Sequence, residues 1–444
     1  MDLSAFFSAE EMAAWAGERL ISQGLTFTLL ALRVLFLALL IFGGLNRHLF
    51  ELCQRAAVRI EEARWLAWLG ERLKTLRRLA RALRRFSQGR DPRTPAPAGE
   101  RQWLVDALYP VLLFWSWNLL CLPLDFFLGF VREHARGLAT IGLLRWWLEW
   151  LRGQLVLALF ALLLGYGLFA LARRLRRSWW LWLSGAVAGA LLLWSLTSPM
   201  RARLYNEYRP LPESSLRTRI QSVVTRAGLD PPRVLVVDSS KRTLRAGGYL
   251  MGQGPTLAVV LSDNLIRSFP EREIEVAVAH EVGHQLRDHP LRSLLLTGIS
   301  AIIFLGLIQL VLLYGPRLSR LRLQNGADPA ALPACMALLF LLVNLSSPLG
   351  AYLNRREESQ ADHAALELTR DPVAFASLMI RLARSNQADV DPPAWWVVWR
   401  GSHPPVRDRL RAAFEWARDN GVRLDPAALP LPAPVSAVAN RPPG

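Results

Sequence analysis

The sequence predicts a mainly α-helical membrane protein that carries a small α+β domain. Of its 444 residues, 52% are hydrophobic and only 20% are charged, which is more apolar than a soluble protein of this length. Long apolar runs alternate with two polar stretches, 201–290 and 354–423. The runs predict a polytopic transmembrane bundle, and the polar stretches are the regions that could hold chemistry.

The composition excludes two other classes of protein. The high apolar content excludes intrinsic disorder for most of the chain. The three cysteines, Cys53, Cys121 and Cys335, lie far apart without a CxxC pair, which excludes a disulfide scaffold. The formal net charge is nevertheless +17, and almost all of the basic residues are Arg, since Lys74 and Lys241 are the only lysines. Such a coding bias is typical of a GC-rich, bacterial genome.

Six apolar runs are long enough to be candidate membrane spans, which need about 20 residues each. They are Leu25–Gly43, Trp103–Val131, Gln154–Ala172, Trp179–Leu196, Leu291–Tyr314 and Ala330–Leu349. Arg33 lies in the middle of the first run, where either a buried partner or a wet interior, or snorkelling to the boundary, explains it. The residues before Leu25 are acidic and lack the basic start of a signal peptide.

An Arg-dense segment, 55–101, separates the first two runs. From Ala56 to Phe86, apolar residues recur at helical spacing with Arg between them, which predicts an amphipathic helix on an anionic lipid surface. Nucleic-acid binding is the competing interpretation of such charge, but no recognition module accompanies it. We therefore expect no nucleic-acid partner. The tail from Asp425 onward is rich in Pro and Ala and is predicted to be disordered.

One short motif, His280-Glu281-Val282-Gly283-His284, carries the chemistry. On a helix, positions four apart share a face, so both imidazoles can reach one metal ion. Zn²⁺ accepts His nitrogen readily and is not redox-active. Glu281 is placed between them to take a proton from a zinc-bound water. The HExxH motif therefore predicts a zinc-dependent hydrolytic site.

The residues around the motif predict the helix that carries it. Ser268 and Glu271 are spaced as a capping box, with Ser268 as the N-cap, so the helix should begin near Phe269. Pro290 then interrupts it just before the apolar run at Leu291. At 1.5 Å per residue, the motif lies within about 10–15 Å of that run. The metal site is therefore expected at the membrane boundary.

A third ligand is needed, and the extended motif HExxHxxGxxH does not supply it. That pattern requires Gly at 287 and His at 290, where this chain has Arg287 and Pro290. His289 lies one residue away from the required position. A polar residue at a helix end is the simpler interpretation of His289.

Glu358 is the better candidate for the third ligand. Glu358 and Asp362 are four residues apart and share a helix face. Glu358 can bind the metal while Asp362 orients a ligand imidazole from behind. Glu357 is the competing candidate, because a solvated charge run has the same appearance.

An HExxH followed, two spans later, by ExxxAD resembles the type 1 CAAX prenyl endopeptidases and their HtpX-like relatives, peptidase family M48. The resemblance extends over about residues 104 to 415. The further motifs that carry it are Leu122-Pro123 with Phe130–His134, Asn206 with Pro210–Pro212, Val234–Arg242, Val259–Leu265, and Ser402–Pro405 with Arg409. The long segment before the HExxH helix favours the prenyl-protease branch, because HtpX-like chains are shorter there.

The resemblance implies a chamber of membrane helices around a small zincin, gluzincin-like catalytic domain. It implies one Zn²⁺ per chain held by His280, His284 and Glu358. Glu281 would act as base and then acid. The roles implied for the remaining site residues are an orienting carboxylate for Asp362, oxyanion or substrate binding for His403, and pairing with an acidic site residue for Arg409.

One departure from the family concerns the strand that lines the substrate. The family has Asn-Ala-Tyr after its D-x-S-K-R strand, and this chain has Gly247-Gly248-Tyr249. The backbone edge can still add an extended peptide as a strand. The contact made by the family's Asn side chain is lost.

The expected organisation follows from these assignments. In order it comprises an N-terminal stretch (1–24), membrane helices (25–199) with the Arg-rich segment (55–101), a catalytic region with HExxH (200–290), two membrane helices (291–350), a catalytic region with the third ligand (351–424) and a disordered tail (425–444).

The predicted function is a membrane-embedded zinc endopeptidase similar to the prenyl proteases. An HtpX-like quality-control protease and a non-catalytic membrane scaffold are the alternatives. The partners expected are the lipid bilayer and a peptide or protein substrate, membrane-associated or lipidated. The expected location is a bacterial inner membrane. The positive-inside rule places the catalytic stretches outside the cytoplasm, whereas the resemblance implies a cytoplasm-facing site, which we favour.

Overall fold

The computed structural model describes residues 1–62, 102–175, 177–197, 200, 206–230, 233–252, 257–318, 331–426 and 429. Most of the Arg-rich segment and of the C-terminal tail therefore lies outside the described residues. The described part is mainly helical, with one four-stranded sheet. This agrees with the predicted fold class.

Five of the described helices are long and apolar enough to cross a membrane. They are α1 (Ala9–Ile41), α5 (Gln102–Phe126) with its continuation to Ala135, α7 (Leu143–Arg174), α13 (His289–Leu318) and α14 (Leu332–Thr369). The sixth predicted span forms α8 (Trp179–Leu196), whose apolar stretch is shorter than a full span by the same measure. The chain is a multi-pass membrane protein, and five of the six predicted spans have the expected length.

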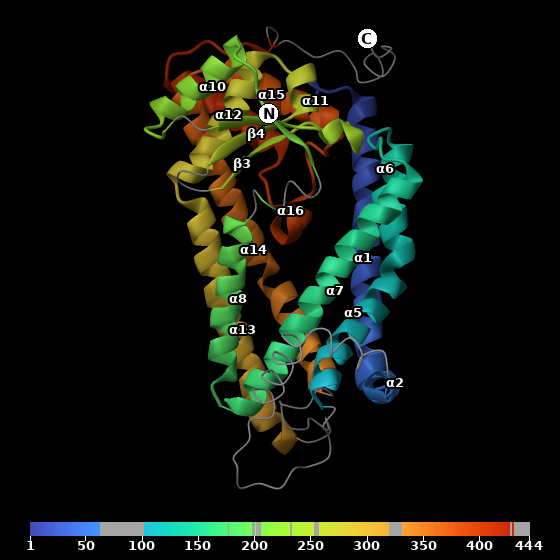
Figure 1. The fold of residues 1–444 in the computed structure, drawn as a ribbon. Coiled ribbons are helices and arrows are strands. Elements are labelled where there is room, and N and C mark those ends of the chain that lie inside the picture. Colours follow the sequence, from blue (N-terminus) through green and yellow to red (C-terminus); the bar gives the residue numbers. More distant parts are fainter. Residues whose placement is uncertain are drawn as a thin grey trace.

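The membrane helices form two groups that diverge toward the sheet (Figure 1). On one side α8 packs on α13 and α13 on α14, and on the other α5 packs on α7. The groups meet at the end far from the sheet, where α2 (Leu45–Glu62) contacts α1 and α5 (Figure 1). A cluster of buried side chains from α1, α2 and α5, flanked by α14, holds this end together.

Arg33, on α1, points toward its neighbouring helices. The carbon of its guanidinium lies 5.1 Å from the ring centroid of Trp117 on α5 and 5.5 Å from that of Phe340 on α14. Cations are attracted to aromatic ring faces at such distances. The sequence left two explanations for Arg33 open, a buried partner or wet interior and snorkelling to the boundary. This geometry supports the first, because it supplies partners within the bundle.

The sheet has the strand order β1-β2-β4-β3. Its strands are β1 (Tyr208–Pro210), β2 (Arg233–Val237), β3 (Gly248–Met251) and β4 (Ala258–Ser262). β2 and β4 run parallel, while β1 and β3 pair antiparallel at the two edges. β4 is buried at every residue, as expected for a central strand of Val and Leu. The sheet thus leaves β3 as an edge strand.

Helices cover the sheet and complete the α+β domain. They are α10 (Ser215–Arg226), α11 (Asp263–Ser268), α12 (Glu271–Leu286), α15 (Pro372–Asn386), α17 (Val406–Asp419) and the C-terminal part of α14, and the short α16 (Ala394–Arg400) packs against α14. The 3-10 turn η2 (Ser239–Lys241) follows β2, and its Ser239 hydroxyl and Ser240 N–H both donate to Asp263. The ends of β2 and β4 are therefore tied together.

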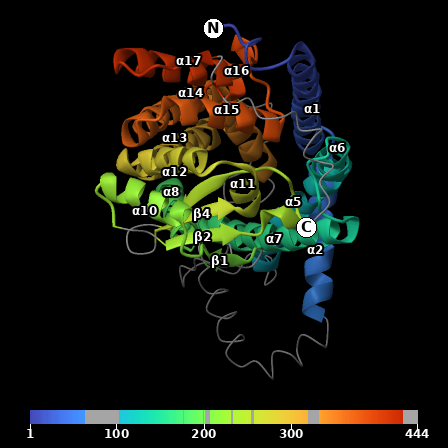
Figure 2. The same ribbon diagram turned by 90° about the horizontal axis from the view of Figure 1, so that it is seen from above.

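The N-terminal stretch belongs to the core of this domain. Phe6, Phe7 and Trp15 are buried in the same hydrophobic cluster as the side chains of α10, α12, α15 and α17. In Figure 2 the N-terminus lies beside α17, and the ring of Phe6 is 6.3 Å from that of Phe414. The expected boundary at residue 24 falls inside α1, whose start is capped by Ser8. Helix α1 therefore begins in the α+β domain and ends at the far end of the bundle.

The predicted capping box of the motif helix is wrong. Ser268 is the last residue of α11, and α12 begins at Glu271 after Pro270, whose side chain cannot cap it. Phe269 is extended (φ −119°, ψ 140°), as residues before Pro generally are. The side chain of Glu271 instead accepts a 2.7 Å hydrogen bond from Ser215 of α10.

A second tie joins the membrane helices to the α+β domain. The π-helical turn η1 (Phe127–Val131) and α6 (Arg132–Ala135) follow α5. Arg132 donates to Glu18 of α1 at 2.7 Å, and Arg245 donates to Glu133 at 2.9 Å. The segment Phe130–His134, which resembles a family motif, thus lies against both α1 and the segment before β3.

Candidate metal centre

Two helices bring the predicted ligands together. α12 carries His280 and His284 on one face, and α14 packs against it with Glu358. The Nε2 atoms of the two imidazoles are 3.2 Å apart. The Glu358 carboxylate lies 3.3 Å from Nε2 of His280 and 3.6 Å from Nε2 of His284. One donor atom from each residue lies within 4.8 Å of the others.

These three residues fit a zinc ion. Two imidazoles and one carboxylate are a common protein ligand set for catalytic Zn²⁺. Oε2 of Glu358 is buried, and its two nearest imidazole nitrogens, Nδ1 of His403 at 2.9 Å and Nε2 of His280 at 3.3 Å, are not in hydrogen-bond geometry with it. A buried carboxylate oxygen in that state is costly unless a cation satisfies it. Glu357, the competing candidate, is outside the cluster and lines a groove with Arg292 and Arg356.

The close approach of α12 and α14 depends on a glycine in the motif. A Cβ on Gly283 would lie 2.9 Å from Cβ of Ala364 and 3.0 Å from the backbone of Ala361. Such distances are too short for real side chains, so only Gly fits here. Small residues on both helices therefore let the two halves of the ligand set meet.

His280 lies against an acidic residue on the side away from Glu358. Its Nδ1 lies 2.9 Å from Oδ1 of Asp362, which is almost fully buried. Arg409 of α17 donates to both carboxylate oxygens of Asp362, at 2.8 Å for the Nε contact. A bidentate pair of this kind fixes the carboxylate and compensates its buried charge.

His284 is held by a residue whose role the sequence did not indicate. His289 is buried, and its Nδ1 lies 2.9 Å from Nδ1 of His284. On its other side, Nε2 of His289 lies 3.0 Å from Oε1 of Gln360 on α14. His289 stands at the start of α13, as expected for a helix-end residue, but it faces the metal centre and is not in solvent.

Burial and the charges at the centre shift the pKa values of the two imidazoles in opposite directions. Burial opposes protonation of His280, but its contacts with Asp362 and Glu358 prevail and raise its pKa to about 9. Burial and the neighbouring charge of His280 lower the pKa of His284 to about 4. Without a metal, His280 is therefore the more basic imidazole of the pair and His284 the less basic one.

Glu281 lies between the ligands and the sheet edge. Burial raises the pKa of its carboxyl, which the neighbouring His280 partly offsets. A hydrogen bond from the backbone of Leu250, on β3, also acts on this carboxyl. The predicted base therefore lies beside the edge strand.

His403 reaches the centre from a loop. Its ring is 60% exposed, and its Nδ1 lies 2.9 Å from Oε2 of Glu358. Arg355, on α14, donates to the carbonyls of Val397 and Gly401 at 2.6 and 2.8 Å. These bonds fix the end of α16 and, with it, the start of the loop that carries His403.

The predicted substrate edge is β3. Gly248 and Tyr249 are its first two residues, and its outer edge is unpaired among the described strands. The Tyr249 hydroxyl is 3.0 Å from that of Tyr208 on β1, so the two rings reach toward each other over one face of the sheet. A Cβ on Gly247 would meet nothing within 4 Å, so no steric reason requires Gly at the place of the family's Asn.

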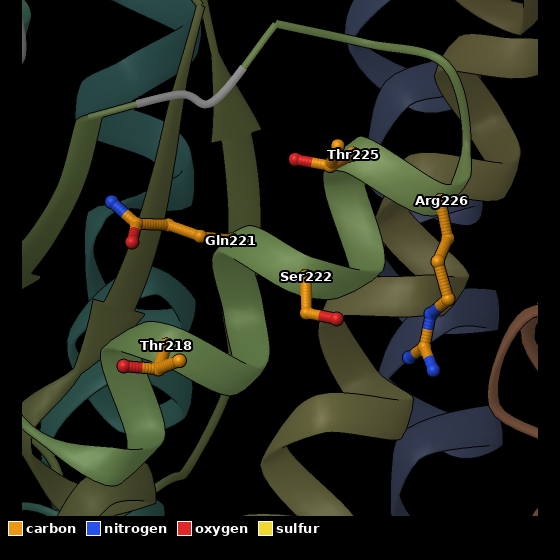
Figure 3. A pocket seen from close by; sticks show the side chains of 5 residues that line it. All are labelled: Thr218, Gln221, Ser222, Thr225 and Arg226. Atoms are coloured by element: carbon orange, nitrogen blue, oxygen red, sulfur yellow. The ribbon is translucent and has the colours of Figure 1, made fainter.

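A separate pocket lies on α10 and offers no comparable chemistry. It is lined by Thr218, Gln221, Ser222, Thr225 and Arg226, all from that helix (Figure 3). Arg226 is engaged with Glu275 at 2.8 Å. The candidate site of this protein is therefore the His-His-Glu cluster.

Several membrane helices joined to an α+β domain with such a cluster define a membrane protein of the metalloprotease type. Residues 210–417 match the family model described as Peptidase family M48.

The relatives that this chain matches are named as proteases or metalloproteases. It is 29% identical over 249 residues to "Uncharacterized metalloprotease YhfN" of Bacillus subtilis, covering 55% of this chain and 58% of that protein. It is 26% identical over 226 residues to "CAAX prenyl protease 1" of Saccharomyces cerevisiae, covering 47% and 49%. The chain thus spans about half the length of these relatives. A "Protease HtpX homolog" of Acaryochloris marina is 29% identical, covering 46% and 72%.

A solved structure shares the fold over nearly the whole molecule. The crystal structure of S. mikatae Ste24p matches with a TM-score of 0.60 and 17% identity, covering 88% of this chain and 97% of that one. At this identity the likeness concerns the fold. It includes the membrane helices that lie outside the M48 segment.

Proposed function

We propose that this protein is a zinc-dependent endopeptidase of the membrane, similar to the CAAX prenyl proteases. The observation that carries the proposal is the convergence of His280, His284 and Glu358 beside Glu281, next to the open edge of β3. A ligand set, a base and a peptide-binding edge are the three parts that hydrolysis of a peptide bond requires.

The ligands and the base have separate tasks. His280, His284 and Glu358 would hold one Zn²⁺, which when bound polarises the scissile carbonyl and makes the attacking water more acidic. The Glu281 carboxylate accepts the proton of that water and returns it to the leaving amine. Its raised pKa suits the first step, because a carboxylate whose pKa lies closer to neutrality is a stronger base toward the water.

The residues around the ligands orient them and the substrate. Asp362, fixed by Arg409, holds the ring of His280 in place. His403, exposed beside Glu358, is placed to donate to the oxyanion or to the substrate backbone. An extended peptide would add to β3 between Gly247 and Tyr249, with its backbone paired to the strand.

The position of the centre suggests which substrates can reach it. His289, which contacts the ligand His284, is the first residue of the spanning helix α13. The site therefore lies at the level where the membrane helices begin, so membrane-associated or lipidated peptides are the class we propose. Cleavage of a prenylated peptide is the specific form of this proposal, supported by the prenyl-protease relatives.

An HtpX-like quality-control activity is the second candidate. The alignment covers 72% of the Acaryochloris marina HtpX homologue, against 49% of the yeast prenyl protease. This candidate shares the site and the chemistry but takes damaged membrane proteins as substrates. The coverage of 97% of the Ste24p chain favours the prenyl-protease architecture.

Purified full-length protein in detergent micelles, loaded with Zn²⁺, tests the proposal. We expect chelator-sensitive cleavage of a farnesylated CAAX peptide, and Glu281→Gln should keep its zinc but lose turnover by several orders of magnitude. Glu357→Gln, the same change outside the cluster, should cleave normally. Undiminished proteolysis by Glu281→Gln would overturn the role of the base. Cleavage of an unfolded membrane protein but not of the farnesylated peptide would select the HtpX-like candidate.

A further inference from the structure

We propose that His289 and Gln360 are positioning residues that fix the tautomer of the metal ligand His284. This inference rests on the proposed metal site and assigns work to two side chains that none of the sequence motifs include. His289 is 2% exposed, and it lies between the ligand imidazole and the amide of Gln360.

The backbone is shaped to bring His289 onto His284. In a continuous helix, residues five apart point about 140° away from each other, so they do not share a face. Here α12 ends at Leu286, and Asp288 adopts a left-handed conformation with φ 54°. This turn starts α13 at His289 and folds its ring back, 5.0 Å from the ring of His284 between centroids.

The proton positions follow from the contacts. A neutral imidazole that binds a metal through Nε2 must carry its proton on Nδ1. Nδ1 of His284 can therefore only donate, and its partner Nδ1 of His289, 2.9 Å away, must accept. His289 then carries its own proton on Nε2, which donates to the carbonyl oxygen of Gln360 at 3.0 Å. An amide oxygen only accepts hydrogen bonds, so Gln360 sets the direction of the whole hydrogen-bond chain from His284 through His289.

The two ligand imidazoles thus have different supports. His280 faces the charged pair of Asp362 and Arg409, whereas His284 faces a neutral chain. An anionic partner raises the basicity of a ligand imidazole more than a neutral one. The neutral hydrogen-bond chain orients His284 without adding a fourth carboxylate to a centre that already holds Glu281, Glu358 and Asp362. This keeps more of the positive charge of the metal available to the reacting groups.

Zinc affinity of the full-length protein, measured by competition with a chromophoric chelator, tests the inference without using activity. His289→Leu removes the acceptor and should weaken zinc binding by about 10- to 100-fold. His289→Asn can place its amide oxygen near the position of Nδ1, so it should keep most of the affinity. His363→Leu, a change of the same kind at an exposed His of α14, should bind zinc as the unchanged protein does.

Gln360 supplies the second arm of the test. Gln360→Glu keeps the acceptor but adds charge, so Co²⁺ bound in place of zinc should show a shifted visible spectrum with retained affinity. Gln360→Leu should lose affinity by a smaller factor than His289→Leu. Thermal unfolding of each metal-free variant shows whether the fold is kept.

The outcomes separate this inference from the proposed function. Zinc affinity unchanged in a folded His289→Leu variant, while His284→Ala loses the metal, would overturn the positioning role and leave the protease proposal intact. Equal losses in His289→Leu and His289→Asn would also overturn it, because the acceptor would then not matter. Absence of stoichiometric zinc in the unchanged protein would instead overturn the metal site itself.

Discussion

Gly283 faces Ala361 so closely that a Cβ on Gly283 would lie 3.0 Å from both the Cα and the carbonyl oxygen of Ala361, so any larger residue there must push the two helices apart. The HExxH helix and the helix of Glu358 are joined at this point. The backbones of the two helices touch at this point. This contact lets two ligands from one polar stretch meet the third ligand from the other.

Gly283→Ala should therefore damage the metal centre without altering a ligand. The added methyl forces α12 and α14 apart, and overpacking of this kind costs about 1–3 kcal/mol. We expect a lower unfolding temperature and a zinc content well below one per chain. Gly350→Ala, in α14 where a Cβ meets nothing within 4 Å, is the matched control and should be neutral or slightly stabilising. Full zinc content in Gly283→Ala would contradict this account.

Exchange of Glu358 separates it from its neighbour Glu357. Glu358→Ala removes a metal ligand, so zinc should be lost on dialysis against a mild chelator, as metal analysis would show. Glu357→Ala should retain zinc, because Glu357 lines a groove outside the cluster. The reverse pattern would make Glu357 the ligand.

Arg409 should matter far more for stability than its neighbour Arg407. Arg409→Ala leaves the buried carboxylate of Asp362 without its cation, which typically costs about 3–5 kcal/mol. Arg407 forms a 2.8 Å pair with Asp391, in which both side chains are about 40% exposed, so Arg407→Ala should cost at most about 1 kcal/mol. Urea unfolding of both variants measures the difference, and similar midpoints would argue against a buried-charge role.

The side of the membrane that holds the site can be measured directly. We expect a cysteine placed at Ser239 to be labelled from the cytoplasm and one at Arg174 from the opposite side. Both should be introduced after Cys53, Cys121 and Cys335 are replaced by Ser. Labelling with an impermeant maleimide in intact cells against inverted vesicles distinguishes the two faces. The reverse labelling would follow the positive-inside rule and place catalysis outside the cytoplasm.

Periodicity and motif spacing predicted the features that are local in sequence. The apolar runs became helices, and His280 and His284 share a face because four residues make about one helical turn. The pairing with Glu358 was predicted only with the help of the family resemblance, since spacing alone could not exclude Glu357. The HExxH motif was the strongest signal because it needs no tertiary information.

Two features that the sequence did not predict lie at helix boundaries. The capping rule failed at Ser268 because the extended Phe269 and Pro270 separate two helices there. His289 was read as a helix-end residue because nothing local reveals that Asp288 turns the chain back toward His284. Only the positive φ of that single residue distinguishes the two cases. The sequence signal for such a contact is a polar residue at a helix boundary beside a metal motif.

The burial of Phe7 and Trp15 within the α+β domain has a consequence for how this protein can be handled. The segment that matches the M48 family begins at residue 210, yet its core is completed by side chains about 200 positions earlier. Arg384 of α15 donates to Glu11 and to the carbonyl of Phe6, which adds polar bonds to the same junction. An excised 210–417 fragment would expose the apolar surface on which these rings pack. It should therefore aggregate unless residues 1–24 are supplied. Helix α1 and the residues before it thus belong both to the membrane bundle and to the core of the α+β domain. Neither part can be separated from the other without exposing that core.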